Sequence, residues 1–213
     1  MINIKSIANG IPWFDLLEKA WDVRHKLLPN AFKKGMYEVL EYETTVEIHD
    51  VKGRNATVTK VEKVRFLQDN VIAFQDQAWG DGKILQDYKC SPGVPVDFYR
   101  SGHKTHVLIS LRDVMNKGNE EIFHIAWKMK DGFLKKHNSW STDIDHQTKK
   151  LLVILVFPHD RIPKNIRFVV NNKNKSHSIR KENPRQLSDK RWKICCEVIN
   201  PMLNGKYTLY WEG

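Results

Sequence analysis

Residues 37–49 read YEVLEYETTVEIH, and this segment decides the fold class. One face of it carries mostly apolar or hydroxyl-bearing side chains and the other mostly acidic ones: Leu40, Tyr42, Thr44, Val46 and Ile48 against Glu41, Glu43, Thr45 and Glu47. A period of two is typical of a strand with one buried face. The segment 50–55 contains Gly53 and predicts a hairpin turn, and the Val- and Thr-rich segment 57–67 predicts the returning strand.

The same pattern continues in shorter segments along the chain. We expect further strands over 71–79, 84–89, 106–113, 122–130, 140–144, 151–157, 166–170, 192–199 and 207–211. A turn at Asn116 and Gly118 predicts that 106–113 and 122–130 pair as a hairpin. Residues 90–102 and 171–190 are predicted to be loops. About ten strands predict a mainly β fold, either an antiparallel β-sandwich or an open barrel.

One amphipathic helix is expected at the N-terminus. Residues 12–28 carry apolar side chains at helical spacing, and prolines at positions 12 and 29 suit its first turn and its end. Such a helix would cover a sheet, or it would dock on a partner through Trp13 and Trp21. We therefore expect an N-terminal helical segment at 1–35, a main antiparallel β domain at 36–157 and a C-terminal β extension at 158–213 packed on the main sheet.

The composition is that of a globular protein. Of the 213 residues, 41% are hydrophobic and 28% are charged, and seven tryptophans indicate an ordered core. Three cysteines are too few for a disulfide framework. The start of the chain lacks a signal peptide, and its longest apolar run, seven residues, is far below the roughly 20 that span a membrane. These features predict a cytoplasmic protein without a membrane segment.

Positive charge is concentrated in one part of the chain. The net charge is +10, and residues 159–193 contain 11 cations and three carboxylates, a local net charge of +8. The candidate binding residues of this basic segment are Lys173, Lys175, Arg180, Lys181, Arg185, Lys190 and Arg191. They are typical of a solvated loop, of a surface for an acidic protein partner, or of a nucleic-acid site. The predicted loop 171–190 contains no aromatic residue for stacking on bases, which weakens the nucleic-acid interpretation.

Catalytic and metal-binding patterns are weak. Cys90 lies in a predicted loop upstream of His103 and His106, but no spacing shows that a thiol and an imidazole meet. In a tight hairpin, His106 and His124 would lie about 17 Å apart, too far to share a metal ion. We predict no metal site and no cofactor.

A row of glutamates on the first strand offers a second catalytic hypothesis. The row consists of Glu41, Glu43 and Glu47 on one strand face. Carboxylates two positions apart on such a face lie about 6.8 Å from each other, a spacing known from paired-carboxylate glycoside hydrolysis. Cations on the following strand explain the row more simply as cross-strand ion pairs. No phosphate-binding loop, dinucleotide fingerprint, nucleophile elbow or His-Glu-x-x-His motif occurs. We therefore name no catalytic residue.

The last third of the chain has a recognisable order of aromatic residues and prolines. Val156-Phe157-Pro158 is followed by Arg161 and Pro163, by Arg191-Trp192-Lys193-Ile194, by Asn200-Pro201-Met202-Leu203, and by Tyr207-Thr208-Leu209-Tyr210-Trp211. Residues 150–211 thereby resemble β-rich accessory modules of prokaryotic defence proteins, which accompany protease or sensor domains. The resemblance implies a binding or regulatory subunit.

Together these features predict a non-catalytic module that binds another protein, with an acidic surface as the expected partner and an antiviral defence system as a possible setting. A nucleic-acid-binding protein that uses the basic segment is the first alternative. A hydrolase with a dispersed site around Cys90 or the glutamate row is the second.

Overall fold

The described part of the chain consists of strands. The computed structural model describes residues 35–172, 175–181 and 183–213, so the predicted helix with Trp13 and Trp21 lies outside it. Within these residues there are fourteen strands. The same residues contain no helix that is long and apolar enough to cross a membrane. The mainly β prediction is confirmed, with more strands than the ten or so expected.

A seven-stranded sheet, sheet A, forms one layer. Its strand order is β12-β13-β9-β1-β2-β7-β4. The strands are β1 (Tyr37–Ile48), β2 (Asn55–Phe66), β4 (Lys83–Ser91), β7 (Glu120–Lys130), β9 (Lys150–Phe157), β12 (Arg185–Gln186) and β13 (Trp192–Ile199). The predicted β1–β2 hairpin is confirmed, with Val46 opposite Val58. The expectation of a wholly antiparallel sheet is wrong, because β1 and β9 run parallel.

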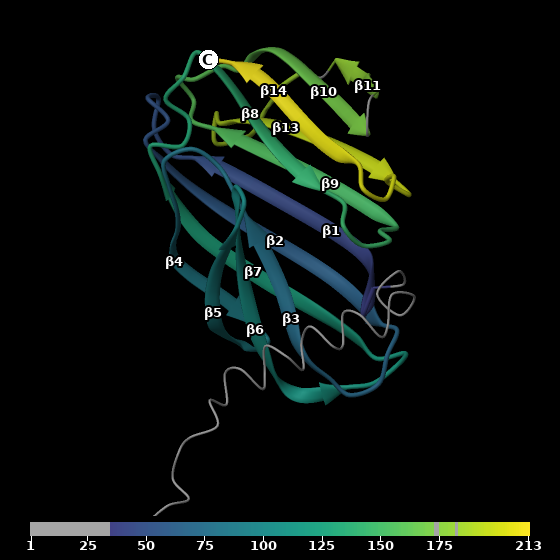
Figure 1. Ribbon diagram of the computed structural model, residues 1–213. Coiled ribbons are helices and arrows are strands. Elements are labelled where there is room, and N and C mark those ends of the chain that lie inside the picture. The colour runs from purple at the N-terminus through teal and green to yellow at the C-terminus, as the bar shows by residue number, and fades with distance from the viewer. Residues whose placement is uncertain (1–34, 173–174, 182) are drawn as a thin grey trace, which may run out of the picture. The chain divides into compact units, whose positions relative to one another are not determined.

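Two smaller sheets form the second layer (Figure 1). Sheet B has the order β3-β6-β5 and consists of β3 (Val71–Ala78), β5 (Val94–Ser101) and β6 (Lys104–Met115). Sheet C has the order β11-β10-β14-β8 and consists of β8 (His137–Asp143), β10 (Lys164–Asn172), β11 (Lys175–Lys181) and β14 (Lys206–Glu212). Their arrangement over sheet A makes the fold an open β-sandwich.

The predicted hairpin between 106–113 and 122–130 is wrong. Strand β6 pairs with β3 and β5, whereas β7 pairs with β2 and β4. The turn around Asn116 and Gly118 therefore carries the chain from sheet B to sheet A. Alternation along a strand shows which face is buried, but it does not show which strand lies alongside.

Both long predicted loops contain strands. Residues 90–102 include the end of β4 and the whole of β5. Residues 171–190 include β11 and β12, and β11 pairs antiparallel with β10. The basic segment is thus partly built into two sheets.

The core lies between sheet A and the two small sheets. Phe74 of β3 stacks on Phe123 of β7 with ring centroids 3.9 Å apart. Trp211 of β14 meets Phe157 of β9 edge to face at 5.7 Å. The strand register places Phe123 and Phe157 on the same face of sheet A, and residues 36–213 form one compact unit. Sheets B and C therefore cover a single face of sheet A.

Candidate functional site

Strand β5 leaves most of its side chains in solvent. It is the edge of sheet B, hydrogen-bonded to β6 on one side. Seven of its eight residues are exposed. Four of them are large and hydrophobic, between 42% and 58% exposed: Val94, Val96, Phe98 and Tyr99. An edge strand presents unpaired N–H and C=O groups, and exposed apolar side chains beside them favour contact with another protein.

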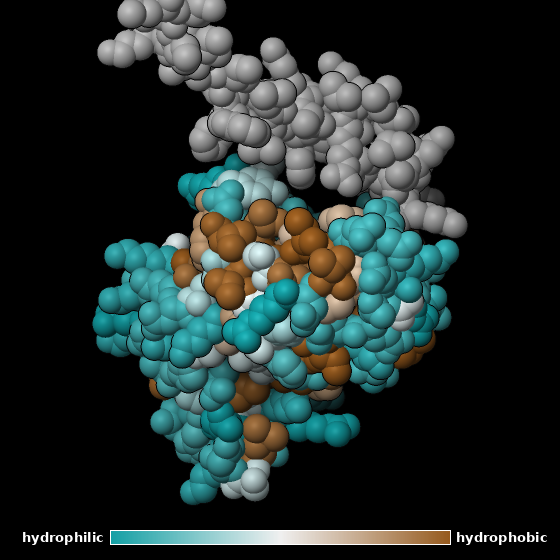
Figure 2. Space-filling view, turned by 90° about the horizontal axis from the view of Figure 1, so that it is seen from below, coloured by the Kyte–Doolittle hydropathy of each residue, from teal (hydrophilic) through white to brown (hydrophobic). Residues whose placement is uncertain are grey.

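The apolar surface continues onto the outer face of sheet B. Ala73 of β3, Ser110 of β6 and Val94 of β5 lie in one cross-strand row. Ile72 and Val114 are exposed near the same end of the sheet. Figure 2 shows hydrophobic side chains gathered on the face seen from below. We call Ile72, Val94, Val96, Phe98, Tyr99 and Val114 the sheet B surface, which includes both sides of the β5 edge, because Phe98 lies opposite the buried Val107 and Tyr99 opposite His106.

Hydrogen bonds hold the aromatic end of this surface in place. The Tyr99 hydroxyl donates to Gln75 Oε1 at 3.2 Å, and the Tyr99 ring stacks on His106 with centroids 5.0 Å apart. Gln75 Nε2 lies 2.8 Å from His106 Nδ1. Burial, together with the charge of Lys104, lowers the pKa of His106, so the imidazole is neutral at pH 7 and its Nδ1 accepts from Gln75. Tyr99 is therefore a fixed aromatic group, as binding hot spots require.

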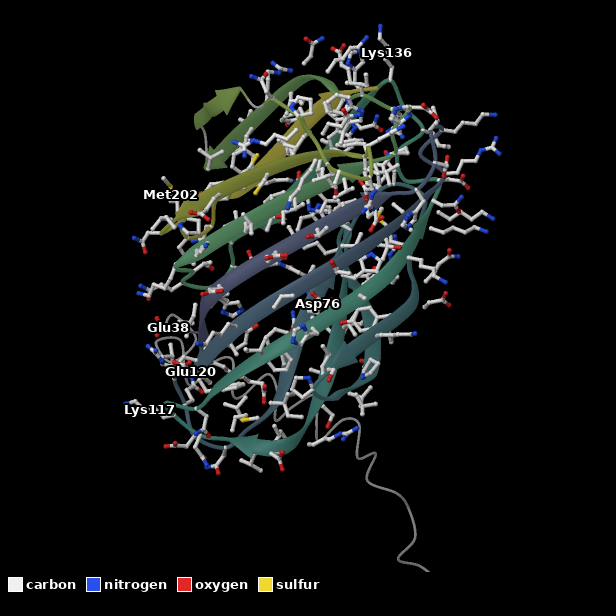
Figure 3. All side chains as sticks on the ribbon, turned by 180° about the vertical axis from the view of Figure 1, so that it is seen from behind. Glu38, Asp76, Lys117, Glu120, Lys136 and Met202 are labelled. Carbon is white, nitrogen blue, oxygen red and sulfur yellow. The ribbon has the colours of Figure 1, made fainter. Side chains whose placement is uncertain are left out.

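A buried ion pair lies between sheets A and B. Lys60 Nζ is 2.6 Å from Asp76 Oδ1 and donates to the Gln77 carbonyl at 2.7 Å. The Tyr88 hydroxyl donates to Asp76 Oδ2 at 3.0 Å. Burial alone would lower the pKa of Lys60, but the charge of Asp76 raises it above its usual value, so the amine stays protonated. Figure 3 shows Asp76 in the interior, away from the labelled residues at the rim.

Glu62 belongs to the same buried cluster. Burial raises the pKa of Glu62 to about 7, and the neighbouring charge of Lys60 limits that rise. The cavity beside Lys60, lined also by Tyr42, Trp79 and Trp127, measures about 10 Å³. That volume holds roughly one water molecule. The cluster is therefore not an open active site despite its shifted pKa values.

A larger cleft of about 260 Å³ lies beside β8. Five consecutive β8 residues, 137–141, line it, and residues 79–81 also contribute to its lining. Met129, Phe133, Lys135 and Lys206 are further lining residues. An ion pair of 2.6 Å joins Lys135 to Asp81 at this cleft.

The residues of the predicted basic site are not equivalent. Lys173 lies outside the described residues, and Lys175, Arg180 and Lys181 belong to β11, an edge strand of sheet C. Arg185 and Lys190 are exposed. Arg191 forms ion pairs with Glu47 and, at 2.7 Å, with Asp189. Because of these pairs, Arg191 stabilises the packing of its own segment.

The structure gives little support to the hydrolase hypotheses. Cys90 Sγ donates to the Gly93 carbonyl at 3.7 Å, and burial, together with the charge of Asp76, raises the pKa of this thiol. A raised pKa disfavours the nucleophilic thiolate. Glu47 of the glutamate row is paired with Arg191. Among the described residues, no three His, Cys, Asp or Glu side chains gather as metal ligands.

Comparisons with known proteins show a similarity of fold only. No protein-family model and no curated protein matches the chain. Among solved structures, the chain is similar to the E323A mutant of an M1 zinc metallopeptidase from Deinococcus radiodurans, bound to a Tyr-Ser-Ala substrate. The TM-score is 0.50 at 6% identity over 82% of this chain. Another structure of the M1 zinc metallopeptidase from that organism gives a TM-score of 0.47 at 6% identity over 81% of this chain. The chain spans 42% of the length of either neighbour.

Sequence reasoning missed the sheet B surface and the cleft. The prolines and glycines around Val94-Pro95-Val96-Asp97-Phe98-Tyr99 predict a loop, whereas the segment forms β5. Its β-branched and aromatic residues were a signal for a strand. The cleft joins residues 79–81 to 137–141, and no local pattern connects segments so far apart in the sequence.

Proposed function

We propose that this chain is a non-catalytic protein-binding module and that the sheet B surface is its contact face. The observation that carries the proposal is the composition of β5, an edge strand with Val94, Val96, Phe98 and Tyr99 in solvent. An extended segment of a partner can add to such an edge through backbone hydrogen bonds, while its side chains pack on the apolar groups.

Features of β5 favour a specific partner over self-association. The β5–β6 register shifts between Pro95 and Asp97, so the edge is irregular there. Pro95 lacks a backbone donor, and Asp97 and Arg100 place opposite charges among the apolar side chains. Proline, charge and register shifts are the devices by which natural edge strands avoid pairing with copies of themselves. A partner with matching charges would be accepted.

Site-specific photo-crosslinking tests the proposal. A benzophenone amino acid replaces Val96, and the full chain is irradiated in its native host. Val51 is the matched control, because it is exposed to a similar degree but lies in the β1–β2 turn. We expect a defined protein adduct at position 96 that is absent at position 51 and is lost when Phe98→Asp is added. Equal labelling at both positions, or none at position 96, would contradict the proposal.

A nucleic-acid-binding protein is the second candidate. It is supported by the position of Lys175, Arg180 and Lys181 on an open sheet edge and by the exposure of Arg185 and Lys190. A fluorescein-labelled duplex should then bind with an affinity that falls steeply with salt, with a log–log slope near 0.9 per neutralised phosphate. Salt-independent or absent binding would contradict it.

The cellular setting rests on the sequence. The resemblance of residues 150–211 to accessory modules of defence proteins supports a role as a regulatory subunit, and the sparse cysteines support a reducing compartment such as the cytoplasm. Identification of the protein crosslinked at position 96 by mass spectrometry tests both proposals together. A defence component would support the first, and a cytoplasmic protein the second.

A further inference from the structure

The cleft beside β8 is lined along the length of one strand. Its lining includes His137, Asn138, Ser139, Trp140 and Ser141 without a gap, so the cleft follows the strand and does not cross it. Five residues of a strand extend over about 17 Å. Residues 79–81, which follow β3, line the cleft too, with Met129 and Phe133 adding apolar side chains.

The strand that lines the cleft has an unused edge. Strand β8 is the last strand of sheet C and pairs with β14 on one side. On its other side, no strand of the described residues pairs with it. Its backbone N–H and C=O groups on that side can therefore hydrogen-bond to an added strand, the mode called β-augmentation.

An unpartnered donor in the lining indicates a ligand with acceptor oxygens. Trp140 is 8% exposed, and its indole Nε1 is buried with no hydrogen-bond partner. A buried N–H without a partner costs free energy that a bound carbonyl or carboxylate oxygen would recover. Trp140 also lines the cleft, and because its Nε1 atom is covered by protein, an acceptor on a ligand there meets it only when the indole turns toward the cleft.

The charges of the lining indicate the sign of the ligand. Lys135 and Lys206 line the cleft, and Asp81 is the one carboxylate among its lining residues. Asp81 is already paired with Lys135. Lys206 Nζ lies 5.9 Å from the ring centroid of Trp79, and no carboxylate of the described residues forms an ion pair with it. The cleft therefore has a surplus cation beside an aromatic wall, which complements a negative side chain.

We propose that this cleft binds an extended acidic peptide segment, which adds as a strand to the open edge of β8 and places a carboxylate near Lys206. The site is separate from the sheet B surface, because the cleft adjoins residues 79–81 after the end of β3, whereas Ile72 lies at the start of β3 and no residue of β5 or β6 lines the cleft. It gives the module a second contact, selective for an acidic segment, in addition to the β5 edge.

Labelled model peptides test this inference by fluorescence anisotropy with the full chain. The first probe is a fluorescein-labelled octapeptide of alternating glutamate and valine, and the second has lysine in place of glutamate. Two further probes carry N-methyl groups on alternate amides of the acidic peptide, one in each register. We expect the acidic peptide to bind about tenfold more tightly than the basic one, and at least one N-methylated register to lose binding.

Variants locate the binding site on the protein. Lys206→Glu and the milder Lys206→Gln should weaken the acidic peptide, and Trp140→Phe should weaken it by removing the indole donor. Lys193→Glu, on β13 of sheet A, is the matched charge control and should leave binding unchanged. Melting temperatures show which variants remain folded, and Lys206→Gln keeps the test valid if the charge reversal unfolds the protein.

Three results would overturn the inference. They are no binding of the acidic peptide, binding that is indifferent to Lys206→Gln and Trp140→Phe, and undiminished binding of both N-methylated peptides. In the second case the peptide binds elsewhere, for example on the basic segment. Crosslinking at Val96 tests the β5 edge and not the β8 edge. A failure of peptide binding at the cleft is therefore distinguishable from a failure of the proposed function.

Discussion

The Lys60 ammonium lies 2.6 Å from the Asp76 carboxylate, and both side chains are almost fully buried between β2 and β3. Lys60 Nζ also lies 5.0 Å from the ring centroid of Trp127. Two sheets of different strand order are thus joined by a charge pair within an otherwise mostly apolar core. Charge pairs of this kind are expensive to break from one side only.

Removal of Lys60 alone should therefore destabilise the protein strongly. Lys60→Met leaves Asp76 buried without its cation, and we expect a loss of about 3–5 kcal/mol in the free energy of unfolding. The double variant Lys60→Met/Asp76→Leu removes both charges and should recover part of that loss. Urea denaturation measures both values, and a single variant as stable as the parent would show that the pair is not buried in solution.

The stability of the protein should depend on pH through Glu62. Burial raises the pKa of Glu62 from 4.5 to about 7, so the folded state binds its proton more tightly than the unfolded state does. The resulting stabilisation is complete below about pH 4.5 and is lost as the pH rises through about 7. Glu62→Gln should remove this dependence and be more stable than the parent above pH 7, by an amount on the order of 3 kcal/mol. Parallel denaturation curves of parent and variant across this range check the sign.

The two faces of β7 provide a matched pair of truncations. Trp127 is 2% exposed, so Trp127→Ala should cost about 3–5 kcal/mol. Ile122 lies on the opposite face of the same strand at 43% exposure, and Ile122→Ala should change stability by less than about 0.5 kcal/mol. Thermal and urea unfolding compare them. Similar costs at both positions would mean that the faces of β7 are assigned wrongly.

Gly53 should tolerate no side chain. It has a φ of +70°, and a Cβ atom there would overlap the Phe133 carbonyl and the Arg161 guanidinium. Gly53→Ala should cost about 2–4 kcal/mol from strain and overlap together. Gly102 has a φ of +60° with nothing near its Cβ position, so Gly102→Ala carries the strain alone, about 1–2 kcal/mol. A difference in melting temperature between the two variants isolates the overlap.

Charge reversal should separate the two roles of the basic segment. Reversal of Lys173, Lys175, Arg180 and Lys181 should weaken binding to an acidic partner or a nucleic acid with little change in melting temperature. Arg191→Glu should lower the melting temperature, because it replaces the pairing with Glu47 and Asp189 by repulsion. Arg185→Glu, at an exposed position nearby, is the control for the melting temperature of Arg191→Glu. Unchanged binding after the fourfold reversal would remove this segment from the site.

The sequence predicted local features well where one face is buried. The β1–β2 hairpin is confirmed, and the register shifts between Val39 and Glu41. This irregularity explains why Val39 is buried although it precedes the alternating set that begins at Leu40. A bulge moves subsequent side chains to the other face, and no propensity marks its position.

Non-local pairing could not be predicted. The alternation in β6 and β7 was equally compatible with one hairpin or with two sheets, and the pairing of Lys60 with Asp76 depends on which sheets face each other. For the same reason the cleft beside β8 could not be predicted from the sequence. Its lining residues come together only after sheets A, B and C have packed.

The parallel contact between β1 and β9 can form only late in synthesis. The hairpin neighbour of Val46, Val58, is made about a dozen residues later, but its other neighbour, Leu155, is made only after roughly a hundred more, on the order of 5–20 s on the ribosome. During that interval the backbone N–H and C=O groups on one side of the nascent β1 have no neighbouring strand. Chaperone binding and aggregation should therefore be greatest before residue 157 has been made, because until then the incomplete chain exposes its central strand as an edge.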